Sequence, residues 1–297
     1  VRTASSNGVK VVGITHGYHG LITGNIKEMT TRSVSETIHR GGTVLHTSRC
    51  PEMATEEGCE KAANVCKVLG LDALIVIGGD GSIYGGLELA RRGVNVICIP
   101  ATIDLDLPCS DYTIGFDTAV NTGMEAINKI RDTSSSHERC SVVEVMGRNA
   151  GHIAEWCGIT GGAEDVLLPE FHEFDSDAII EQIVKNRASG KTHNLIIVAE
   201  GVGKTVELAK KIERVTGIET RPTILGYLQR GGSPTAVDRM HASVMGYTAV
   251  EVLLNGEQNK VIVYKDGKYS GMDIEEALAV TRAYDSKLYD IMKTLAS

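Results

Sequence analysis

Two carboxylates in the stretch of residues 100–122 have the spacing and setting of catalytic groups. Asp104 and Asp106 follow the apolar run 94–99, which predicts a buried strand, and they precede a segment with a helical pattern. In an open α/β sheet, ligands bind beyond the carboxyl ends of the strands, so acids at such an end face a binding cleft. Short polar residues also cap turns, so this segment alone does not establish a site.

A second strand end carries a glycine-rich turn that could bind phosphate beside these carboxylates. The β-branched run 73–77 leads directly into the sequence GGDGS at residues 78–82 and then into a helical pattern. Glycines let backbone N–H groups approach a phosphate, and the N-terminus of the following helix favours negative charge. Asp80 can hold the Mg²⁺ that accompanies a nucleotide. The two strand ends together predict a phosphate cradle and a base.

The elements that must position these groups alternate between strand and helix, a pattern typical of a parallel sheet covered by helices on both faces. We expect strands at residues 9–14, 43–47, 73–77, 94–99, 140–146, 166–168, 195–199, 222–225 and 261–264. We expect a helix tail at 1–7 and helices at 33–39, 55–66, 82–92, 117–131, 150–159, 175–187, 206–215, 236–254, 274–282 and 285–295. Thr55 is the expected N-cap of its helix, Tyr18 is expected in a loop, and Asp266-Gly267 predicts a hairpin turn.

Length and composition narrow the class of protein. The chain has 297 residues, enough for two domains, and its net charge of −8 argues against non-specific binding to nucleic acid or to an anionic membrane. No apolar run has the length of a membrane span, and no signal-peptide pattern opens the sequence. The seven cysteines are odd in number and include no C-x-x-C pair. They indicate a reduced, cytoplasmic protein with buried thiols, without a disulfide framework or a zinc site.

Several separated motifs, in order from residue 9 to the C-terminus, resemble those of the ATP-dependent 6-phosphofructokinase family in its bacterial, single-unit form (the phosphofructokinase A group). The motifs are GGDGS, PxTIDxDxP, DYTIGFDTAxNT, DTSSSHER, EVMGR, AEGVG and GxxQRGGSPTxxDR. The resemblance implies two doubly wound, Rossmann-like parallel-sheet domains with the active site in the cleft between them. It implies an ATP- and Mg-binding domain at residues 1–115 and 234–283, and a sugar-phosphate-binding domain at 116–233 and 284–297. Members of the family open with a strand and a Gly-rich turn that have no counterpart in the sequence from Val1 on.

The activity implied by the resemblance is phosphorylation of fructose 6-phosphate at its 1-hydroxyl by ATP, a step of glycolysis. By the same resemblance, Asp104 is the general base, Thr102 bonds the transferring phosphoryl group, Asp106 supports the metal and the base, and Arg148 stabilises developing charge. Asp80 is the Mg²⁺ ligand. The implied nucleotide site comprises Tyr18, Arg49, Cys50, Gly79, Asp80, Gly81 and Ser82.

The sugar phosphate requires a group of guanidinium side chains, which match phosphate oxygens bidentately. The candidates are Arg139, Arg221 and Arg230, and the resemblance implies that the first two reach the active site of a neighbouring subunit in a homo-oligomer, a tetramer. Glu200 is expected to hydrogen-bond sugar hydroxyls. The implied substrate-binding set is completed by Thr102, Ile103, Asp104, Met146, Gly147, Arg148 and Tyr227.

The sequence departs from the family pattern at three positions near these motifs. Tyr227 replaces the usual histidine, which leaves the sugar preference open because tyrosine is larger and uncharged. Leu105 replaces Asn and Ala101 replaces Gly, and we expect these small or outward-facing changes to be tolerated. Pyrophosphate-dependent relatives carry Asp and Lys at the positions of Gly81 and Ala101, so small residues there leave room for ATP.

A regulatory site for ADP or phosphoenolpyruvate is also implied. The matching residues are Arg131, Gly162, Ala163, Glu164, Lys191 and His193. Thr31 and Ser189 stand where basic residues are common, so we expect a weak or absent response to effectors.

Three functions stay open from the sequence. The first is the ATP-dependent kinase, and the second is the same chemistry on another ketohexose phosphate or with pyrophosphate. The third is a non-catalytic subunit that binds sugar phosphate and regulates a partner. The joint presence of Asp80, Thr102, Asp104 and Arg148 favours the first.

Overall fold

The structure, a computed structural model, describes residues 1–171 and 174–296, and these form two compact units. The first unit comprises Val1–Thr102, Leu107–Gly115 and Ser233–Arg282, and the second comprises Ile103–Asp106, Phe116–Gly232 and the residues from Ala283 on. The sequence-based boundaries differ at Ser233, which was expected in the second unit, at Ala283, which was expected in the first, and at the short segment Ile103–Asp106, which was also expected in the first unit. It belongs to the second because Ile103 and Leu105 pack against the core of that unit.

The main sheet of the first unit has the strand order β11-β10-β4-β3, with β5 paired to the end of β4. Its strands are β3 (Leu74–Gly78), β4 (Val96–Thr102), β5 (Ile114–Gly115), β10 (Lys260–Lys265) and β11 (Lys268–Asp273). β3, β5 and β10 all run parallel to β4, whereas β10 and β11 form the antiparallel hairpin expected around Asp266-Gly267.

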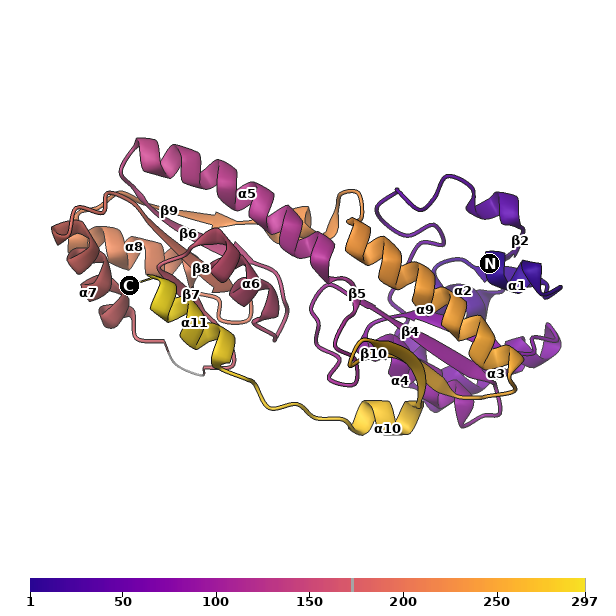
Figure 1. Cartoon of the computed structure of the whole chain (residues 1–297). Helices are drawn as coiled ribbons and strands as arrows, with labels where there is room; N and C mark the ends of the chain where they lie inside the picture. Colours follow the sequence, from indigo (N-terminus) through magenta and orange to yellow (C-terminus); the bar gives the residue numbers. More distant parts are fainter. Residues whose placement is uncertain (172–173, 297) are drawn as a thin grey trace. The chain divides into compact units, whose positions relative to one another are not determined.

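Helices cover both faces of β4 (Figure 1). The helices of this unit are α1 (Arg2–Ser6), α2 (Gly17–Thr23), α3 (Glu56–Val68), α4 (Asp80–Ala90), α9 (Ala236–Leu254) and α10 (Ile274–Ala279). α9 packs on Ile97 and Ile99, while α3, α4 and α10 pack on the face that carries Val96 and Cys98. The cover is incomplete at β3, where Ile75 is 38% exposed and Ile77 is 64% exposed. The expectation of a sheet covered on both faces therefore holds at β4 and not along all of β3.

The N-terminal part of the first unit differs most from the sequence-based expectation. Tyr18 lies on helix α2 instead of a loop, and β1 (Val11–Ile14) pairs antiparallel with β2 (Ile26–Met29), a strand that the sequence pattern did not predict. The helix expected at residues 33–39 is reduced to a single 3-10 turn, η1 (Thr31–Val34), because Glu36 has a left-handed backbone with φ 53°. The strand expected at residues 43–47 is absent, since the N–H of His46 closes a turn onto the carbonyl of Thr43.

The second unit contains a fully parallel sheet in the order β7-β8-β6-β9. Its strands are β6 (Cys140–Val145), β7 (Asp165–Leu167), β8 (Asn194–Ala199) and β9 (Thr220–Ile224). Its helices are α5 (Phe116–Ser136), α6 (His152–Gly161), α7 (Ser176–Ala188), α8 (Thr205–Thr216) and α11 (Lys287–Ala296), with the 3-10 turn η3 (Gly226–Arg230). α5, α6 and α11 bury one face of the sheet and α7 and α8 bury the other, so this unit is doubly wound as expected.

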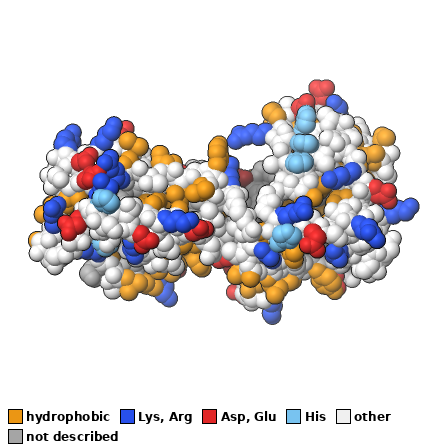
Figure 2. All heavy atoms as spheres, turned by 90° about the horizontal axis from the view of Figure 1, so that it is seen from above, with side chains coloured by type: hydrophobic (Ala, Val, Ile, Leu, Met, Phe, Trp, Pro, Cys, Tyr) orange, Lys and Arg blue, Asp and Glu red, His pale blue; other side chains and the backbone are white. Residues whose placement is uncertain are grey.

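The surface carries charges of both signs. On the face shown in Figure 2, acidic and basic side chains are interspersed and do not form one large patch of a single sign. Ion pairs between exposed neighbours, such as Lys129 with Glu125 at 2.6 Å, are part of this pattern. Within the described part of the chain, no helix is both long enough and apolar enough to cross a membrane.

Candidate active site

The glycine turn after β3 leaves the N-terminus of α4 without a side-chain cap. Gly79 is the N-cap residue, and as a glycine it has no side chain that could cap the helix. A Cβ atom on Gly78 would lie 2.3 Å from Oγ of Ser82, so a larger residue at Gly78 would force that serine to move. The N-terminus of this helix, with the positive end of the helix dipole, is an anion-binding site of the kind that phosphate groups occupy.

The donor set at this turn fits a magnesium ion that is bound together with a nucleotide. Asp80 is the first residue of α4 and the acid in its first turn. Mg²⁺ in such sites takes one or two carboxylates and completes its octahedron with substrate phosphates and water. A Cβ atom on Gly81 would meet no atom within 4 Å, so the space beside this turn is open.

Thr102 lies next to the glycine turn within the first unit. Gly78 pairs with Pro100 across β3 and β4, and a Cβ atom on Gly79 would lie 3.5 Å from Cβ of Thr102. The carbonyl oxygen of Thr102 accepts a hydrogen bond of 2.7 Å from the hydroxyl of Thr113. This contact holds the end of β4 in place, so the predicted phosphoryl-binding threonine and the predicted phosphate turn are neighbours.

Asp238 is a buried carboxylate that sequence reasoning did not single out. It is 2% exposed at the start of α9, and its Oδ1 accepts hydrogen bonds of 2.6 Å from the hydroxyl of Tyr112 and from the N–H of Gly115. These bonds fix the segment that leads from the active-site stretch into β5. The aspartate of the motif GGSPTxxDR was the signal for it.

The remaining predicted nucleotide residues of the first unit differ in accessibility. The hydroxyl of Tyr18 donates a 2.6 Å hydrogen bond to the carbonyl of Ser82, and its ring lies against Gly85. Burial raises the pKa of the Tyr18 phenol, so this hydroxyl stays protonated. Arg49 is exposed, while Cys50 is partly buried and packs against the core. Tyr18 therefore packs against the first turns of α4 and helps to hold the glycine turn in position.

In the second unit, the carboxylate of Glu200, in the loop after β8, accepts hydrogen bonds from the loop after β6. Oε1 of Glu200 accepts a hydrogen bond of 3.2 Å from the N–H of Gly147 and one of 2.6 Å from the N–H of Arg148. Arg148 has a left-handed backbone with φ 57°, and Gly147 has φ 146°. A Cβ atom on Gly147 would lie 2.5 Å from the carbonyl oxygen of Ala150. The Met-Gly-Arg turn therefore requires its glycine, and Glu200 holds the turn in shape.

Asp104 lies among charges of both signs. Burial raises its pKa to about 6, and the negative charges of Asp106 and Glu200 add to the rise, while Arg230 and Arg148 oppose it. The Arg148 guanidinium lies 3.6 Å from the Asp106 carboxylate. The structure thus brings five of the predicted catalytic and substrate-binding side chains together within the second unit. A carboxyl group with this pKa is a base that is ionised near neutral pH and can accept a proton.

Leu105, between the two acids, is not the outward-facing residue that we expected. Its backbone is left-handed with φ 53°, and its side chain packs partly against the core of the second unit. Asparagine adopts this conformation more readily than leucine. The structure therefore explains why the family pattern has Asn here, and packing of the Leu105 side chain offsets the less favourable backbone.

The turn η3 carries three residues that contact this region. Gln229 is 1% exposed; its Oε1 accepts a 2.7 Å hydrogen bond from the N–H of Met146, and its Nε2 donates one of 3.3 Å to the carbonyl of Ala119. Sequence reasoning overlooked this glutamine, although it stands in the GxxQRGG motif. The guanidinium of Arg230 lies 5.3 Å from the ring centroid of Tyr227, which is 80% exposed. The tyrosine is thus placed to orient Arg230 by a cation–π contact.

Arg139 and Arg221 lie at the other end of the same sheet. They meet on one carboxylate, Glu219, whose Oε2 is 2.6 Å from Nε of Arg139 and whose Oε1 pairs with Arg221. The hydrogen bond from Arg139 is the main cause of the lowered pKa of Glu219. Arg139 precedes β6 and Arg148 follows it, so the six residues of the strand separate them by about 20 Å. Arg139 therefore lies at the opposite end of β6 from Arg148.

The residues expected at a regulatory site form a group within the second unit. Arg131 donates a 2.7 Å hydrogen bond to the carbonyl of Gly162, and Nζ of Lys191 lies 2.6 Å from Oε1 of Glu164. Glu164 also accepts a hydrogen bond from the N–H of Leu195. The Ala163 side chain is buried, and His193 directly precedes β8. These contacts bring Arg131, Lys191 and the segment Gly162–Glu164 together, whereas none of them involves His193; Nε of Arg131 is buried without a hydrogen-bond partner.

Comparison with known proteins agrees with this geometry. A family model described as Phosphofructokinase matches residues 1–253. The ATP-dependent 6-phosphofructokinase of Clostridium botulinum is 57% identical over 296 residues, which covers 100% of this chain and 92% of the relative. The protein of the same name from Clostridium acetobutylicum is 56% identical over the same length and share of both chains.

Solved structures show the same fold. The phosphofructokinase of Saccharomyces cerevisiae superposes with a TM-score of 0.86 at 31% identity, and the match covers 94% of this chain and 42% of the yeast chain. The pyrophosphate-dependent phosphofructokinase of Marinobacter aquaeolei superposes with a TM-score of 0.83 at 22% identity, covering 96% of this chain and 80% of that chain. The second likeness is one of fold alone.

Proposed function

This chain belongs to the phosphofructokinase family, and from that premise we propose that it phosphorylates D-fructose 6-phosphate at the 1-hydroxyl with ATP, a step of glycolysis. The products are fructose 1,6-bisphosphate and ADP. The observation that carries the proposal is the environment of Asp104, whose pKa is raised to about 6 beside Asp106, Glu200, Arg230 and Arg148. Phosphoryl transfer to a sugar hydroxyl needs a base of this strength and cations around the transferred group.

In the proposed reaction the 1-hydroxyl oxygen attacks the γ-phosphorus of ATP. A new bond forms between that oxygen and phosphorus, the bond from the γ-phosphorus to the bridging oxygen breaks, and ADP leaves. Asp104 accepts the hydroxyl proton, and the Arg148 guanidinium stabilises the negative charge that develops on the transferred phosphoryl oxygens. Asp106 lies 3.6 Å from this guanidinium and orients it. The Thr102 hydroxyl hydrogen-bonds the transferred group.

The nucleotide phosphates bind at the turn Gly79–Ser82, where the N-terminus of α4 begins at a glycine and presents the positive end of the helix dipole. Asp80 would hold Mg²⁺, which when bound neutralises charge on the phosphates. The open space beside Gly81 supports ATP as the donor, because that space accommodates the nucleoside part of the molecule. Arg49 and Cys50 line the same nucleotide site.

The 6-phosphate of the sugar binds to guanidinium groups from two subunits of a homo-oligomer, a tetramer. Arg230 belongs to the same unit as Asp104 and supplies one of them. Arg139 and Arg221 supply the others to a neighbouring subunit, which is supported by their position at the far end of β6 from Arg148. The carboxylate of Glu219 holds both arginines until the sugar phosphate displaces it. Glu200 hydrogen-bonds the sugar hydroxyls.

A regulatory anion site at Arg131, Gly162, Ala163, Glu164, Lys191 and His193 is part of the proposal, with a weak response to ADP or phosphoenolpyruvate. A strong shift of the fructose 6-phosphate saturation curve by ADP would contradict that weak response.

The experiment that tests the proposed function is an assay of fructose 1,6-bisphosphate formation with ATP and, separately, with pyrophosphate. Turnover with ATP and Mg²⁺ on fructose 6-phosphate is the expected result. Turnover with pyrophosphate alone, or a preference for another ketohexose phosphate, would replace the donor or the sugar in the proposal. No turnover with either donor, together with binding of fructose 6-phosphate, would instead favour a non-catalytic, regulatory subunit.

Mixing two inactive variants tests the shared site directly. Asp104→Asn removes the base, and Arg221→Ala removes a phosphate ligand that we assign to the neighbouring site. Hybrid oligomers contain some sites with both residues intact, so the mixture should recover activity that neither variant has at low sugar concentration. If the mixture after subunit exchange is no more active than the two separate samples, Arg221 does not act across subunits.

A further inference from the structure

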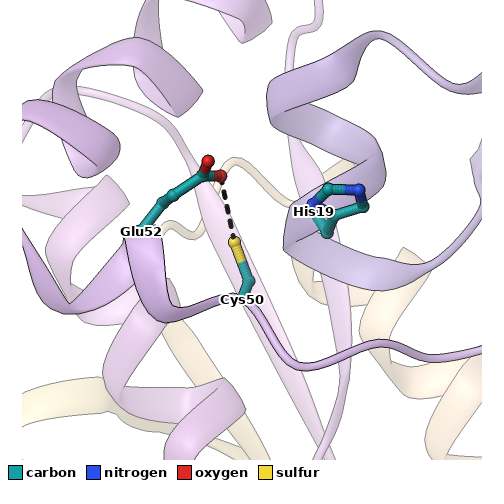
Figure 3. A group of neighbouring side chains, drawn as sticks. All are labelled: His19, Cys50 and Glu52. Carbon is teal, nitrogen blue, oxygen red and sulfur yellow. Dashed lines mark hydrogen bonds between the residues drawn. The ribbon is translucent and has the colours of Figure 1, made fainter.

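A group of three unlike metal ligands lies in the first unit at one end of helix α3. It consists of His19 on α2 and of Cys50 and Glu52 at the 3-10 turn η2 (Pro51–Ala54). One ligand atom from each side chain lies within 4.8 Å of the other two, and the Sγ–H of Cys50 points to Oε2 of Glu52 at 3.9 Å (Figure 3). Among the described residues, no other group of three or more His, Cys, Asp or Glu side chains meets this distance.

The chemistry of the three ligand atoms is that of a zinc site. Thiolate sulfur, imidazole nitrogen and carboxylate oxygen are the ligands that Zn²⁺ takes in proteins, at about 2.0 to 2.3 Å. In a tetrahedral site two such ligands lie roughly 3.3 to 3.8 Å apart. The three atoms therefore need to approach by about 1 Å, which rotation of the exposed His19 and Glu52 side chains can supply.

The backbone around Cys50 and Glu52 is held in place before any ion binds. Pro51 between them has a restricted φ, and the carbonyl of Cys50 accepts a 3.2 Å hydrogen bond from the N–H of Met53. The carbonyl of Glu52 accepts a 2.7 Å hydrogen bond from the hydroxyl of Thr55. The Cys50 side chain also packs against the core. The backbone positions of two of the three ligands are thus fixed relative to each other, while the Glu52 side chain can still rotate.

Cys50 also differs from the other cysteines of the chain. All seven are described and carry free thiols, but six of them are buried and only Cys50 is partly exposed. The sequence pattern argued against a zinc site because it contains no C-x-x-C pair. The group arises because the chain folds α2 against α3, which brings His19 beside a turn that lies some thirty residues later.

We propose that His19, Cys50 and Glu52 bind one Zn²⁺ ion with water in the fourth position, and that bound Zn²⁺ competes with ATP. Zn²⁺ replaces the thiol proton of Cys50, which passes to the solvent, and the thiolate and carboxylate together balance the charge of the ion. Three protein ligands and an open position are typical of an exchangeable zinc site and not of one that holds a fold together. Competition is expected because Cys50 directly follows Arg49 in the proposed nucleotide site, so this second half rests on the proposed function.

Binding is tested without any activity assay, by titrating the full chain with Zn²⁺ against a chromophoric zinc indicator. The expected result is one ion per chain, with an affinity that falls about 10-fold or more in His19→Gln, in Cys50→Ser and in Glu52→Gln. Co²⁺ used as a probe should give a sulfur-to-metal charge-transfer band that Cys50→Ser removes. Thermal melts without metal should show that all three variants are folded, since His19 and Glu52 are exposed and Cys50→Ser changes one atom of a partly exposed side chain.

Matched controls come from the same unit. His46→Gln removes an imidazole whose ring centroid lies 5.3 Å from that of His16, so it tests whether this pair of histidines binds Zn²⁺ instead. Glu57→Gln removes an exposed carboxylate on α3. Neither variant should change the affinity for Zn²⁺. If the wild-type chain binds no Zn²⁺ at micromolar concentrations, or if His46→Gln weakens binding as much as His19→Gln does, the proposed site is wrong.

The second half is tested by steady-state kinetics with excess Mg²⁺. Zn²⁺ should raise the KM for ATP while leaving kcat unchanged, and His19→Gln should abolish this effect. Zinc binding without a change in KM would overturn the competition and leave the site itself intact. Activity measured in the absence of Zn²⁺ tests the proposed kinase function separately, so failure of either proposal can be told from failure of the other.

Discussion

In the proposed reaction, the glycine turn of the first unit and the strand ends of the second unit both act on phosphate groups, but by different means. The turn Gly79–Ser82 presents backbone N–H groups at the start of a helix, and its shape depends on residues without side chains. The second unit uses charged side chains that hold one another, with Glu200 fixing the Arg148 turn and Arg148 beside Asp106. Asp104 lies within that group, and its pKa is raised mainly by burial and further by the neighbouring carboxylates.

The difference teaches how binding and reaction place different demands on a site. Holding a phosphate that changes little requires fixed donors, which a backbone turn supplies. Moving a proton requires a group whose pKa lies near the working pH, and only a cluster of nearby charges and partial burial can supply that. Substitutions in the second region should therefore alter the rate and its pH dependence, whereas those in the first should alter the affinity for ATP.

The largest effect is expected from Asp104→Asn, which keeps the shape of the side chain and removes the base. We expect kcat to fall by about 10²- to 10⁴-fold with little change in the half-saturating concentration of fructose 6-phosphate. Steady-state kinetics of the purified variant measure both quantities. Asp132→Asn, an exposed aspartate on α5 of the same unit, is the control and should behave as wild type. Near-normal turnover in Asp104→Asn would show that another group takes the proton.

The first region is tested by two substitutions at Gly81. Gly81→Asp places a carboxylate beside the nucleotide phosphates, so we expect the KM for ATP to rise about 10-fold or more through like-charge repulsion. Gly81→Ala is the matched control, because its Cβ atom meets no neighbour within 4 Å and alanine is favoured in a helix. Kinetics with varied ATP distinguish the two variants. An equal rise of KM in both would mean that the space beside Gly81, and not its charge, controls ATP binding.

The pH dependence sharpens the role of the charge cluster. Activity needs ionised Asp104, so kcat/KM should rise with pH through a midpoint near the Asp104 pKa of about 6. Glu200→Gln removes one of the negative charges that raise this pKa and keeps an oxygen for the Arg148 turn, so the midpoint should move to lower pH. A pH–rate profile of each protein measures the midpoint. An unchanged midpoint in Glu200→Gln would mean that its charge does not act on Asp104.

The same shift has a consequence for stability. Because the pKa of Asp104 rises from 3.8 to about 6 on folding, the folded chain takes up a proton between these values. The destabilisation from an ionised Asp104 is therefore absent below the lower value and complete above the higher one. Asp104→Asn should raise the melting temperature at pH 7 and leave it unchanged at pH 3.5. An equal change of melting temperature at both pH values would point to packing instead of charge.

The smallest effect is expected at Tyr227. Arg230 lies over its ring at 5.3 Å, and such exposed contacts contribute about 0.5 to 1 kcal/mol. Tyr227→Ala should therefore raise the KM for fructose 6-phosphate by roughly 2- to 5-fold, converted at about 1.4 kcal/mol per factor of ten. Tyr227→Phe keeps the ring and should stay close to wild type. A large loss in Tyr227→Phe would show that the hydroxyl itself binds the sugar.

Most of the helices and strands could be predicted from the sequence, and the misses share a cause. The helix α3 with its Thr55 cap, the long helix α9 and the strands β6 and β8 follow from apolar periodicity and capping residues. Residues 15–50 did not follow, because glycines, isolated apolar side chains and left-handed residues such as Glu36 give no regular period there. The conformation of residues 15–50 depends instead on their contacts with other parts of the first unit, which a local sequence pattern does not reveal.

The candidate site divides in the same way. Asp104, Asp80 and the glycine turn could be identified from residue types at strand ends, and the order of motifs indicated the family. Gln229 and Glu219 could not be identified from their spacing, because their importance lies in partners that are far away in the sequence. The conformation of Leu105 likewise depends on a left-handed backbone that its residue type does not favour.

By itself, the sequence determined the alternation of strands and helices, the acid and glycine positions at two strand ends, and membership of the family. These features depend on local patterns, which a chain carries along its length. Only the tertiary structure decided the pKa of Asp104, the placement of Arg139 and Arg221 at the far end of β6, and the meeting of His19 with Cys50 and Glu52. Those features depend on distances between side chains far apart in sequence, and electrostatic and coordination energies change steeply with such distances.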